Sequence, residues 1–248
     1  MPGKCSPRYK ARYGAGAQDL RAAQALRFRC FRGPGDGLDH DDFDALCRHV
    51  LIEEEATGRL VACFRLLPLT SGRAIRQSYA AQYYELSALE EFSDPMIEIG
   101  RFCIHPDAKA PADILRLAWG VVTRDVDAEG AGMLFGCSSF AGTDATLYRD
   151  TFALLGERHL APKRWLPRVK APKVVRFAGR LRKKPDPKRA QSGLPPLLRS
   201  YLMLGGWVSD HAVVDEDLGT LHVFTGVEIA AVPPARARLL RADAAQMA

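Results

Sequence analysis

The chain has 248 residues, of which 47% are hydrophobic and 26% charged, with a formal net charge of +6. This balance is typical of a globular protein with a real core, and it excludes a disordered or fibrous chain. No run approaches the apolar length of a membrane span, and the basic, Gly/Ala-rich N-terminus lacks the apolar core of a secretory signal. We therefore expect a cytoplasmic protein with one domain, residues 19–232, between flexible tails at 1–18 and 233–248.

The first half of the chain changes from helical to strand periodicity. An apolar row and an acidic start predict a helix over residues 19–31, followed by a Gly/Pro loop. Residues 41–50 are predicted as a second helix with an acidic start. Alternating segments around a turn then predict a β-hairpin at residues 50–54 and 60–67. A short helix over residues 79–89 follows.

The second half predicts a strand over residues 97–105 and a long helix over residues 111–126, whose apolar face is the clearest in the chain. Together with the first half, the order predicts an α/β sandwich around a mixed, mostly antiparallel sheet. No nucleotide-binding glycine motif argues for a doubly wound fold. The remaining elements are strands at 132–140, 207–214 and 220–229 and helices at 146–155 and 197–204.

Positive charge is concentrated in residues 157–189, which contain thirteen Lys or Arg and two acids. We expect a basic insert at about residues 157–195. Such a segment attracts an acidic protein, an anionic lipid surface or a nucleic acid, unless it is simply a solvated loop. The segment has few aromatic residues for base stacking, so nucleic acid is not the expected partner.

The six cysteines occur singly, without a C-x-x-C pair or the spacing of a metal site. They fit buried, reduced thiols, and we predict neither a metal site nor a bound cofactor. A hydrolase using Cys103 or Cys137 with His105 or His159 is an alternative, but a Cys-x-His pair on a strand lacks activation by a helix dipole.

Two opposite charges interrupt the apolar strand at residues 97–105, namely Glu98 and Arg101. Residues three apart face opposite sides of a regular strand. Gly100 between them predicts a bulge that turns both side chains into one cleft. The alternative is a buried structural ion pair.

Further charges stand in apolar surroundings. Arg27 lies in the apolar row of the first helix, and Arg65 interrupts an apolar strand. An unpaired buried charge is costly, so each needs a partner. Asp41 and Asp44 suit the start of a helix, yet there are more acids here than one cap requires. Arg27 is therefore a candidate partner for them.

Together these residues resemble the signature of the acyl-homoserine-lactone synthases, most closely in Phe-Arg-Leu-Leu-Pro at 64–68 and Glu-x-x-Arg-Phe at 98–102. A related family, the L-ornithine Nα-acyltransferases of ornithine-lipid synthesis (hemolysin-like), is more similar still, over roughly residues 19–232. That resemblance rests on residues 98–101 with His105-Pro106, on 135–140 with 142–144, on 158–162 and on 201–208.

The resemblance implies a GNAT-type three-layer sandwich and an N-acyltransferase. Such an enzyme moves a (3-hydroxy)acyl chain from acyl carrier protein to the α-amino group of ornithine, giving lyso-ornithine lipid. The alternative is a lactone synthase using S-adenosylmethionine, but its pattern expects a tryptophan shortly after Phe31, where this chain has a glycine-rich loop. The implied catalytic residues are Glu98 and Arg101, and the implied substrate-binding residues are Arg27, Phe31, Asp41, Asp44, Arg65, Ser139 and Thr143.

The loop at residues 106–112 contains no glycine, so a cradle for the diphosphate of coenzyme A is not evident. This favours the phosphopantetheine thioester of acyl carrier protein as donor, with Lys109, Lys163 and Arg164 as contacts. The basic segment would steer in this acidic partner or rest on the anionic inner membrane. We expect direct aminolysis, with Glu98 taking the proton and backbone N–H groups stabilising the oxyanion.

Overall fold

The computed structural model describes residues 8–179 and 185–245, and the chain forms two compact units. The first contains Met1–Leu67, Ile99–Glu129 and Pro234–Ala248, and the second contains Pro68–Glu98 and Gly130–Pro233. Strand β5 (Met96–Ile104) begins in the second unit and ends in the first. The predicted α/β architecture with a mostly antiparallel sheet is confirmed.

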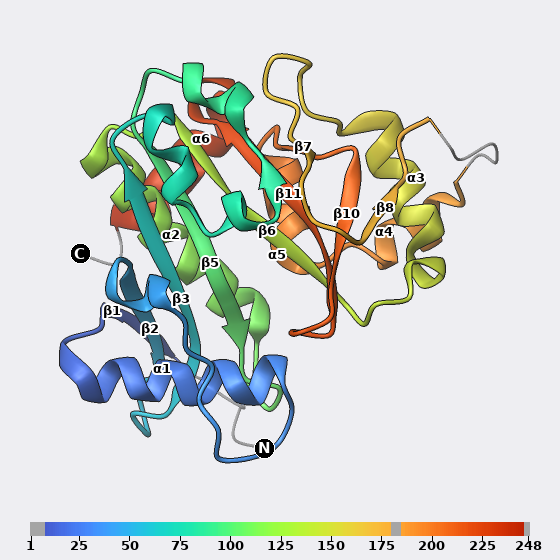
Figure 1. The fold of residues 1–248 in the computed structure, drawn as a ribbon. Coiled ribbons are helices and arrows are strands. Elements are labelled where there is room, and N and C mark those ends of the chain that lie inside the picture. The colour runs from blue at the N-terminus through green and yellow to red at the C-terminus, as the bar shows by residue number, and fades with distance from the viewer. Residues whose placement is uncertain (1–7, 180–184, 246–248) are drawn as a thin grey trace. The chain divides into compact units, whose positions relative to one another are not determined.

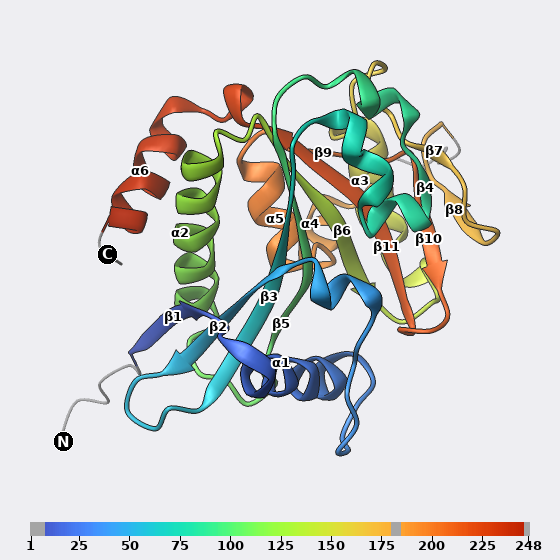
Figure 2. The same ribbon diagram turned by 60° about the vertical axis from the view of Figure 1, so that its left-hand side comes forward.

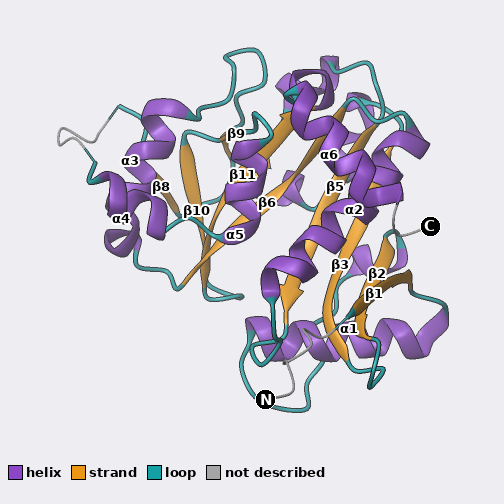
Figure 3. Cartoon of the chain, turned by 180° about the vertical axis from the view of Figure 1, so that it is seen from behind, coloured by secondary structure: helices purple, strands orange, loops and turns teal. Residues whose placement is uncertain are grey.

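The first unit is a sheet with a helix on each face. Its strands lie in the order β1-β2-β3-β5, and the pairs β1–β2 and β2–β3 are antiparallel. Helices α1 and α2 lie on opposite faces of this sheet (Figures 1 and 3), and α6 packs against α2. The elements are β1 (Tyr9–Tyr13), α1 (Gly16–Phe31), a 3₁₀ turn (Asp42–Ala45), β2 (Arg48–Glu54), β3 (Leu60–Leu69), α2 (Pro111–Glu129) and α6 (Pro234–Ala245).

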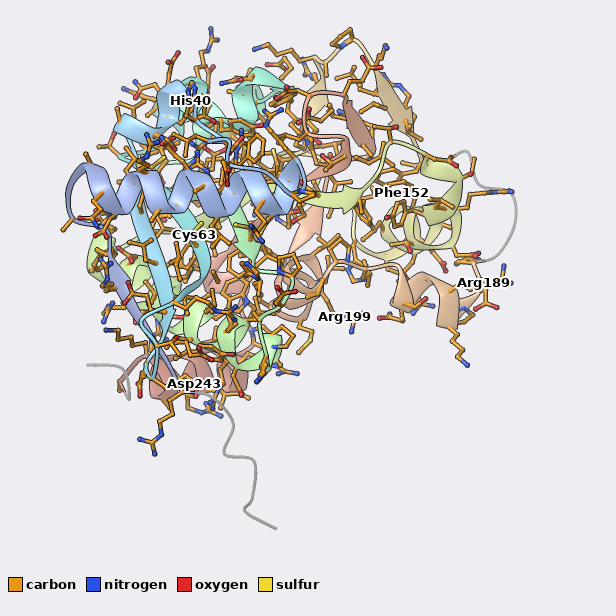
Figure 4. The ribbon with its side chains drawn as sticks, turned by 90° about the horizontal axis from the view of Figure 1, so that it is seen from below. His40, Cys63, Phe152, Arg189, Arg199 and Asp243 are labelled. Atoms are coloured by element: carbon orange, nitrogen blue, oxygen red, sulfur yellow. The ribbon has the colours of Figure 1, made fainter. Side chains whose placement is uncertain are left out.

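The core between α1 and the sheet is small and apolar. Ala23 and Leu26 of the helix pack against Leu51, Cys63 and Cys103, one from each of three strands. Cys63 is labelled beside α1 in Figure 4. Since side chains alternate along a strand, one residue in two faces the helix. The helix face that buries Ala23 and Leu26 therefore also buries the next residue, Arg27.

The second unit is a sheet in the order β6-β11-β10-β8, with β9 also paired to β11. Helices α3, α4 and α5 cover one face, where Phe152, Ala190 and Leu198 pack against Leu221 and Val223 of β11. The elements are β6 (Met133–Ala141), a 3₁₀ turn (Ala145–Tyr148), α3 (Arg149–Arg158), β8 (Val174–Arg176), α4 (Pro187–Ser192), α5 (Pro196–Met203), β9 (Trp207–Val208), β10 (His211–Asp215), β11 (Thr220–Glu228) and a 3₁₀ turn (Ile229–Ala231).

The other face of this sheet carries the irregular segment of residues 72–91 (Figure 2). The ring of Tyr84 packs against His222 and Phe224, which alternate along β11 with the residues facing the helices. The segment consists of 3₁₀ turns (Gly72–Gln77, Ala80–Gln82 and Ser87–Glu91) and β4 (Tyr84–Glu85), which pairs with β7 (Arg168–Val169).

Two predicted helices are wrong. Residues 41–50 form a 3₁₀ turn and then enter β2, because Val50 belongs to the sheet core while Leu46, on the predicted apolar face, is 61% exposed. Residues 79–89 are turns around β4, since the pairing with β7 takes the backbone out of a helical path.

The predicted tails are also wrong within the described residues. Tyr9–Tyr13 is an edge strand on β2, where Arg12 pairs with both Glu53 and Asp19. The C-terminal residues form α6, and Arg241 binds Asp127 of α2. Residues 1–7 and 246–248 of these predicted tails lie outside the described residues.

The segment predicted as a basic insert lies within the second unit. Strand β8 pairs with β10, and Phe177, Ala190 and Leu194 lie in the core. Four of its cations, Arg180 and residues 182–184, lie outside the described residues. Within residues 8–179 and 185–245, no helix is both long and apolar enough to cross a membrane.

The close packing at Gly72 predicts a stability effect. A Cβ there would lie 1.9 Å from the carbonyl oxygen of Leu89, so Gly72→Ala is expected to lower the free energy of unfolding by about 3 kcal/mol. Gly156→Ala, in helix α3, is the control, because its Cβ would meet atoms no closer than 3.4 Å. Urea denaturation measures both, and equal stability of the two variants would contradict the packing.

Candidate active site

Three arginines and three aspartates form a largely buried cluster in the first unit. The arginines come from three different elements, α1, β3 and β5, whereas the aspartates all come from the connection between α1 and β2. The cluster therefore ties one connection to the helix and to two strands. Its members are Arg27, Arg65, Arg101, Asp39, Asp41 and Asp44.

Arg27 is 1% exposed and binds two carboxylates. Its Nη1 and Nη2 donate to Asp44 at 2.7 and 2.9 Å, and its Nε donates to Asp39 at 3.0 Å. Burial opposes the charged form, but the hydrogen bond to Asp44 and the nearby carboxylates raise the pKa of Arg27. Burial likewise opposes ionisation of Asp44, yet hydrogen bonds from Arg27 and Gln24 hold its pKa well below the ordinary value.

Arg65 joins the other side of Asp44 to Asp41. Its Nη1 donates to Asp41 at 2.5 Å and to Asp44 at 2.8 Å, and its Nη2 donates to Asp41 at 2.8 Å. Burial opposes ionisation of Asp41, but these hydrogen bonds lower its pKa. Gly100 gives the Arg65 side chain room, because a Cβ at Gly100 would lie 3.2 Å from Nε.

Arg101 completes the cluster from an unusual backbone conformation. Its φ is +52°, so the departure from a regular strand lies at Arg101 and not, as predicted, at Gly100. A left-handed conformation costs a non-glycine residue about 1–2 kcal/mol. The side chain donates to Asp39 at 3.0 Å and to Asp41 at 3.2 Å. These two contacts favour the conformation in which the guanidinium reaches the cluster.

Glu98 is the last residue of the first segment of the second unit, and the backbone donors to its carboxylate belong to the same unit. It is 3% exposed, and its two carboxylate oxygens accept the backbone N–H groups of Tyr79 at 2.8 Å and Ala80 at 2.7 Å. Two fixed donors leave the carboxylate with one orientation. Burial, and after it the charge of Glu98, raises the pKa of the Tyr201 phenol. Glu98 is thus a buried charge next to a tyrosine of α5.

The other predicted site residues are more dispersed. Phe31 packs at the margin of the core under α1. Ser139 is exposed on β6, opposite His222 of β11, and Thr143 is exposed after that strand. Among the predicted carrier contacts, Lys109 and Lys163 have exposed side chains, while Arg164 donates to Glu228 at 2.9 Å.

Asp39 is a member of the cluster that sequence reasoning missed. It is one of four aspartates within residues 39–44, and only the local turn decides which of them face the arginines. Asp42 belongs to the same run but is exposed. The amide donors of Tyr79 and Ala80 were missed as well, since backbone groups leave no sequence signal.

The thiols do not support a cysteine hydrolase. Cys103 is buried, with its sulfur 3.6 Å from that of Cys63. A hydrogen bond with Cys30 opposes the shift, but the contact with Cys63 and burial raise the pKa of Cys103 well above its ordinary value. A neutral, buried thiol is a poor nucleophile. Cys5 lies outside the described residues, and none of the other five cysteines forms a disulfide.

Comparison with known proteins identifies the fold. Residues 26–119, which contain Arg27, the aspartates and Glu98 to Arg101, match the acetyltransferase (GNAT) domain. The solved structure of FeeM, an N-acyl amino acid synthase from uncultured soil microbes, superposes with a TM-score of 0.52 at 11% identity, covering 98% of this chain and 100% of that one. The fold is therefore that of a GNAT-type acyltransferase.

Curated relatives define the family more closely. The chain is 35% identical over 230 residues to the L-ornithine N(alpha)-acyltransferase of Rhodobacter capsulatus, covering 87% of this chain and 88% of that protein. It is 28% identical over 226 residues to that of Brucella abortus, covering 83% and 79%. The chain belongs to the L-ornithine N(alpha)-acyltransferase family, and it is an N-acyltransferase.

The depressed pKa of Asp44 predicts how its contribution depends on pH. Asp44→Asn is expected to lower the free energy of unfolding by about 3 kcal/mol near neutral pH, because Arg27 and Arg65 lose a charged partner. This contribution is complete above the ordinary value of 3.8 and is lost as pH falls below it. Denaturation of both proteins across pH should show the difference shrinking, whereas exposed Asp42→Asn should have little effect. A difference that stays constant in acid would contradict the pairing.

The backbone at Arg101 predicts a difference between two truncations. Arg101→Ala and Arg101→Gly both remove the guanidinium, but only glycine relieves the positive φ. We expect the glycine variant to be more stable than the alanine variant by about 1 kcal/mol in denaturant unfolding. An alanine variant at least as stable as the glycine variant would show that the strain is absent.

Proposed function

We propose that this protein transfers an acyl chain from the phosphopantetheine thioester of acyl carrier protein to the α-amino group of ornithine, giving lyso-ornithine lipid. The observation that carries the proposal is the match to the L-ornithine N(alpha)-acyltransferase of Rhodobacter capsulatus, which covers 87% of this chain and 88% of that protein. An acyl donor on a carrier protein also agrees with a loop at residues 106–112 that has no glycine to cradle a diphosphate.

In the proposed reaction the neutral α-amino group attacks the thioester carbonyl. A tetrahedral intermediate forms, the C–S bond breaks, and the phosphopantetheine sulfur leaves as a thiolate, which finally takes up the proton that the nitrogen has lost. The nitrogen must lose one proton, and Glu98 accepts it directly or through one water. The donors from Tyr79 and Ala80 favour the ionised form of the carboxylate and orient it for this task.

For the acceptor, the cluster favours Asp41 over Asp44. Both carboxylates already accept hydrogen bonds from arginines, so exposure is what separates them, and Asp44 is only 7% exposed. The side chain of Asp41 is 22% exposed. We therefore assign the side-chain ammonium of ornithine to Asp41, with Asp44 fixing the arginines around it.

The basic segment is the candidate contact for the acyl donor, the carrier protein. Among the described residues, some of its cations are paired with acids of this chain, and others are not. Arg164, Lys173 and Arg176 face acids of the same unit. Lys163 and Arg189 have exposed side chains that form no ion pair within residues 8–179 and 185–245. Arg189 is labelled in Figure 4. Unpaired cations attract an acidic partner, so we assign the carrier-protein contact to them.

The proposal is tested with purified protein, 3-hydroxyacyl carrier protein and ornithine, followed by mass spectrometry of the lipid product. Lyso-ornithine lipid is the expected product, formed faster from the carrier protein than from the same acyl group on coenzyme A. Parallel reactions contain lysine, glutamine or S-adenosylmethionine as acceptor. An acyl-homoserine lactone made only with S-adenosylmethionine would overturn the proposal.

The role of Glu98 predicts a large loss of turnover. Glu98→Gln should lower kcat by about 10²–10⁴-fold, the usual contribution of a general base. Glu90→Gln, which removes the carboxylate partner of the exposed Arg76, is the matched control and should retain activity. Initial rates are compared after denaturation has confirmed that both variants fold. Near-normal turnover of folded Glu98→Gln would remove the base from the mechanism.

A further inference from the structure

The turn that presents two N–H groups to Glu98 is fixed from inside by a serine. Ser78 is 1% exposed; its hydroxyl donates to the carbonyl of Ile75 at 2.7 Å and accepts the N–H of Ala81 at 3.2 Å. Tyr79 and Ala80, the donors to Glu98, lie between Ser78 and Ala81 in the chain. These local hydrogen bonds therefore hold the buried side of the turn in place.

The outer side of the same turn is held by the basic segment. Strand β7 pairs with β4, so that Val169 lies opposite Tyr84. Two residues further on, Ala171 donates its N–H to the carbonyl of Tyr83 at 3.0 Å. Between these two backbone contacts, Lys170 extends its Nζ to the carbonyl oxygen of Ala81, at 2.5 Å.

Lys170 differs from its basic neighbours in its partner. Arg168 faces Glu85, and Lys173 faces Glu216, so their charges are balanced by carboxylates. The only hydrogen-bond partner of Lys170 among the described residues is a neutral carbonyl. A hydrogen bond from an ammonium group is stronger than one between neutral groups. Lys170 therefore contacts the turn without neutralising an acid there.

We propose that Lys170 is a positioning residue for Glu98. By binding the Ala81 carbonyl it holds the turn in the orientation that directs the Tyr79 and Ala80 N–H groups at the two carboxylate oxygens. The inference rests on the proposed role of Glu98 as the base. On this inference, Lys170 helps to orient the catalytic carboxylate and does not bind a partner protein.

The effect should appear in the rate more than in stability. A hydrogen bond made by an exposed lysine adds little to the free energy of unfolding. A small displacement of a catalytic group, in contrast, lowers turnover strongly. Loss of the amide donors would also destabilise the ionised carboxylate, since backbone N–H groups favour the charged form.

The test compares three variants in the acyl-transfer assay. Lys170→Met keeps the length of the side chain but removes the ammonium, and it should lower kcat about tenfold with little change in KM for the carrier protein. The acid limb of its pH–rate profile should move to higher pH. Lys170→Arg should restore most of the rate. Lys173→Met removes the same charge without touching the turn and should behave as the wild type.

Amide hydrogen exchange by NMR gives a readout that does not depend on activity. In Lys170→Met the N–H groups of Tyr79 and Ala80 should exchange faster than in the wild type, while they remain protected in Lys173→Met. If the wild type acylates no amine, the proposed function fails, and the exchange rates alone decide whether Lys170 holds the turn.

Two results would overturn the inference. One is unchanged kcat and unchanged exchange in Lys170→Met with a raised KM for the carrier protein, which would make Lys170 a docking residue. The other is an equal loss of activity in Lys170→Met and Lys173→Met that added salt abolishes, which would show an effect of surface charge.

Discussion

The first unit depends on the pairing of three largely buried guanidinium groups with three carboxylates. Removing an ion from water costs several kcal/mol, so none of these side chains would be buried without its partners. The arginines come from α1, β3 and β5, and the aspartates come from one irregular connection. Pairing therefore fixes the path of that connection. It also favours the positive φ that Arg101 adopts to reach Asp39 and Asp41.

The cost of removing Glu98 from water is offset in a different way. Each of its carboxylate oxygens accepts a backbone N–H group, and such donors favour the charged form. This arrangement suits a group that exchanges a proton with a substrate. Ser78 holds the turn from within it, whereas Lys170 reaches it from far along the sequence. Neither side chain takes part in the proposed chemistry.

Much of the fold could be predicted because its signals are local. The apolar periodicity of residues 111–126 predicted α2, and alternation around a turn predicted the hairpin of β2 and β3. Residues 41–50 failed because acids suited to a helix start belong to the charged cluster. Residues 9–13 failed because an edge strand is visible only once its partner β2 is in place.

The sequence by itself determined the family and the presence of charged residues within apolar segments, since both are written in short motifs such as residues 98–102. Only the tertiary structure decided which charges meet. Arg101 and Asp39 are 62 residues apart, and Glu98 is bound by amides 18 and 19 residues before it. A buried charge requires a partner at hydrogen-bond distance. Which group stands there depends on how the elements pack, which no local pattern records.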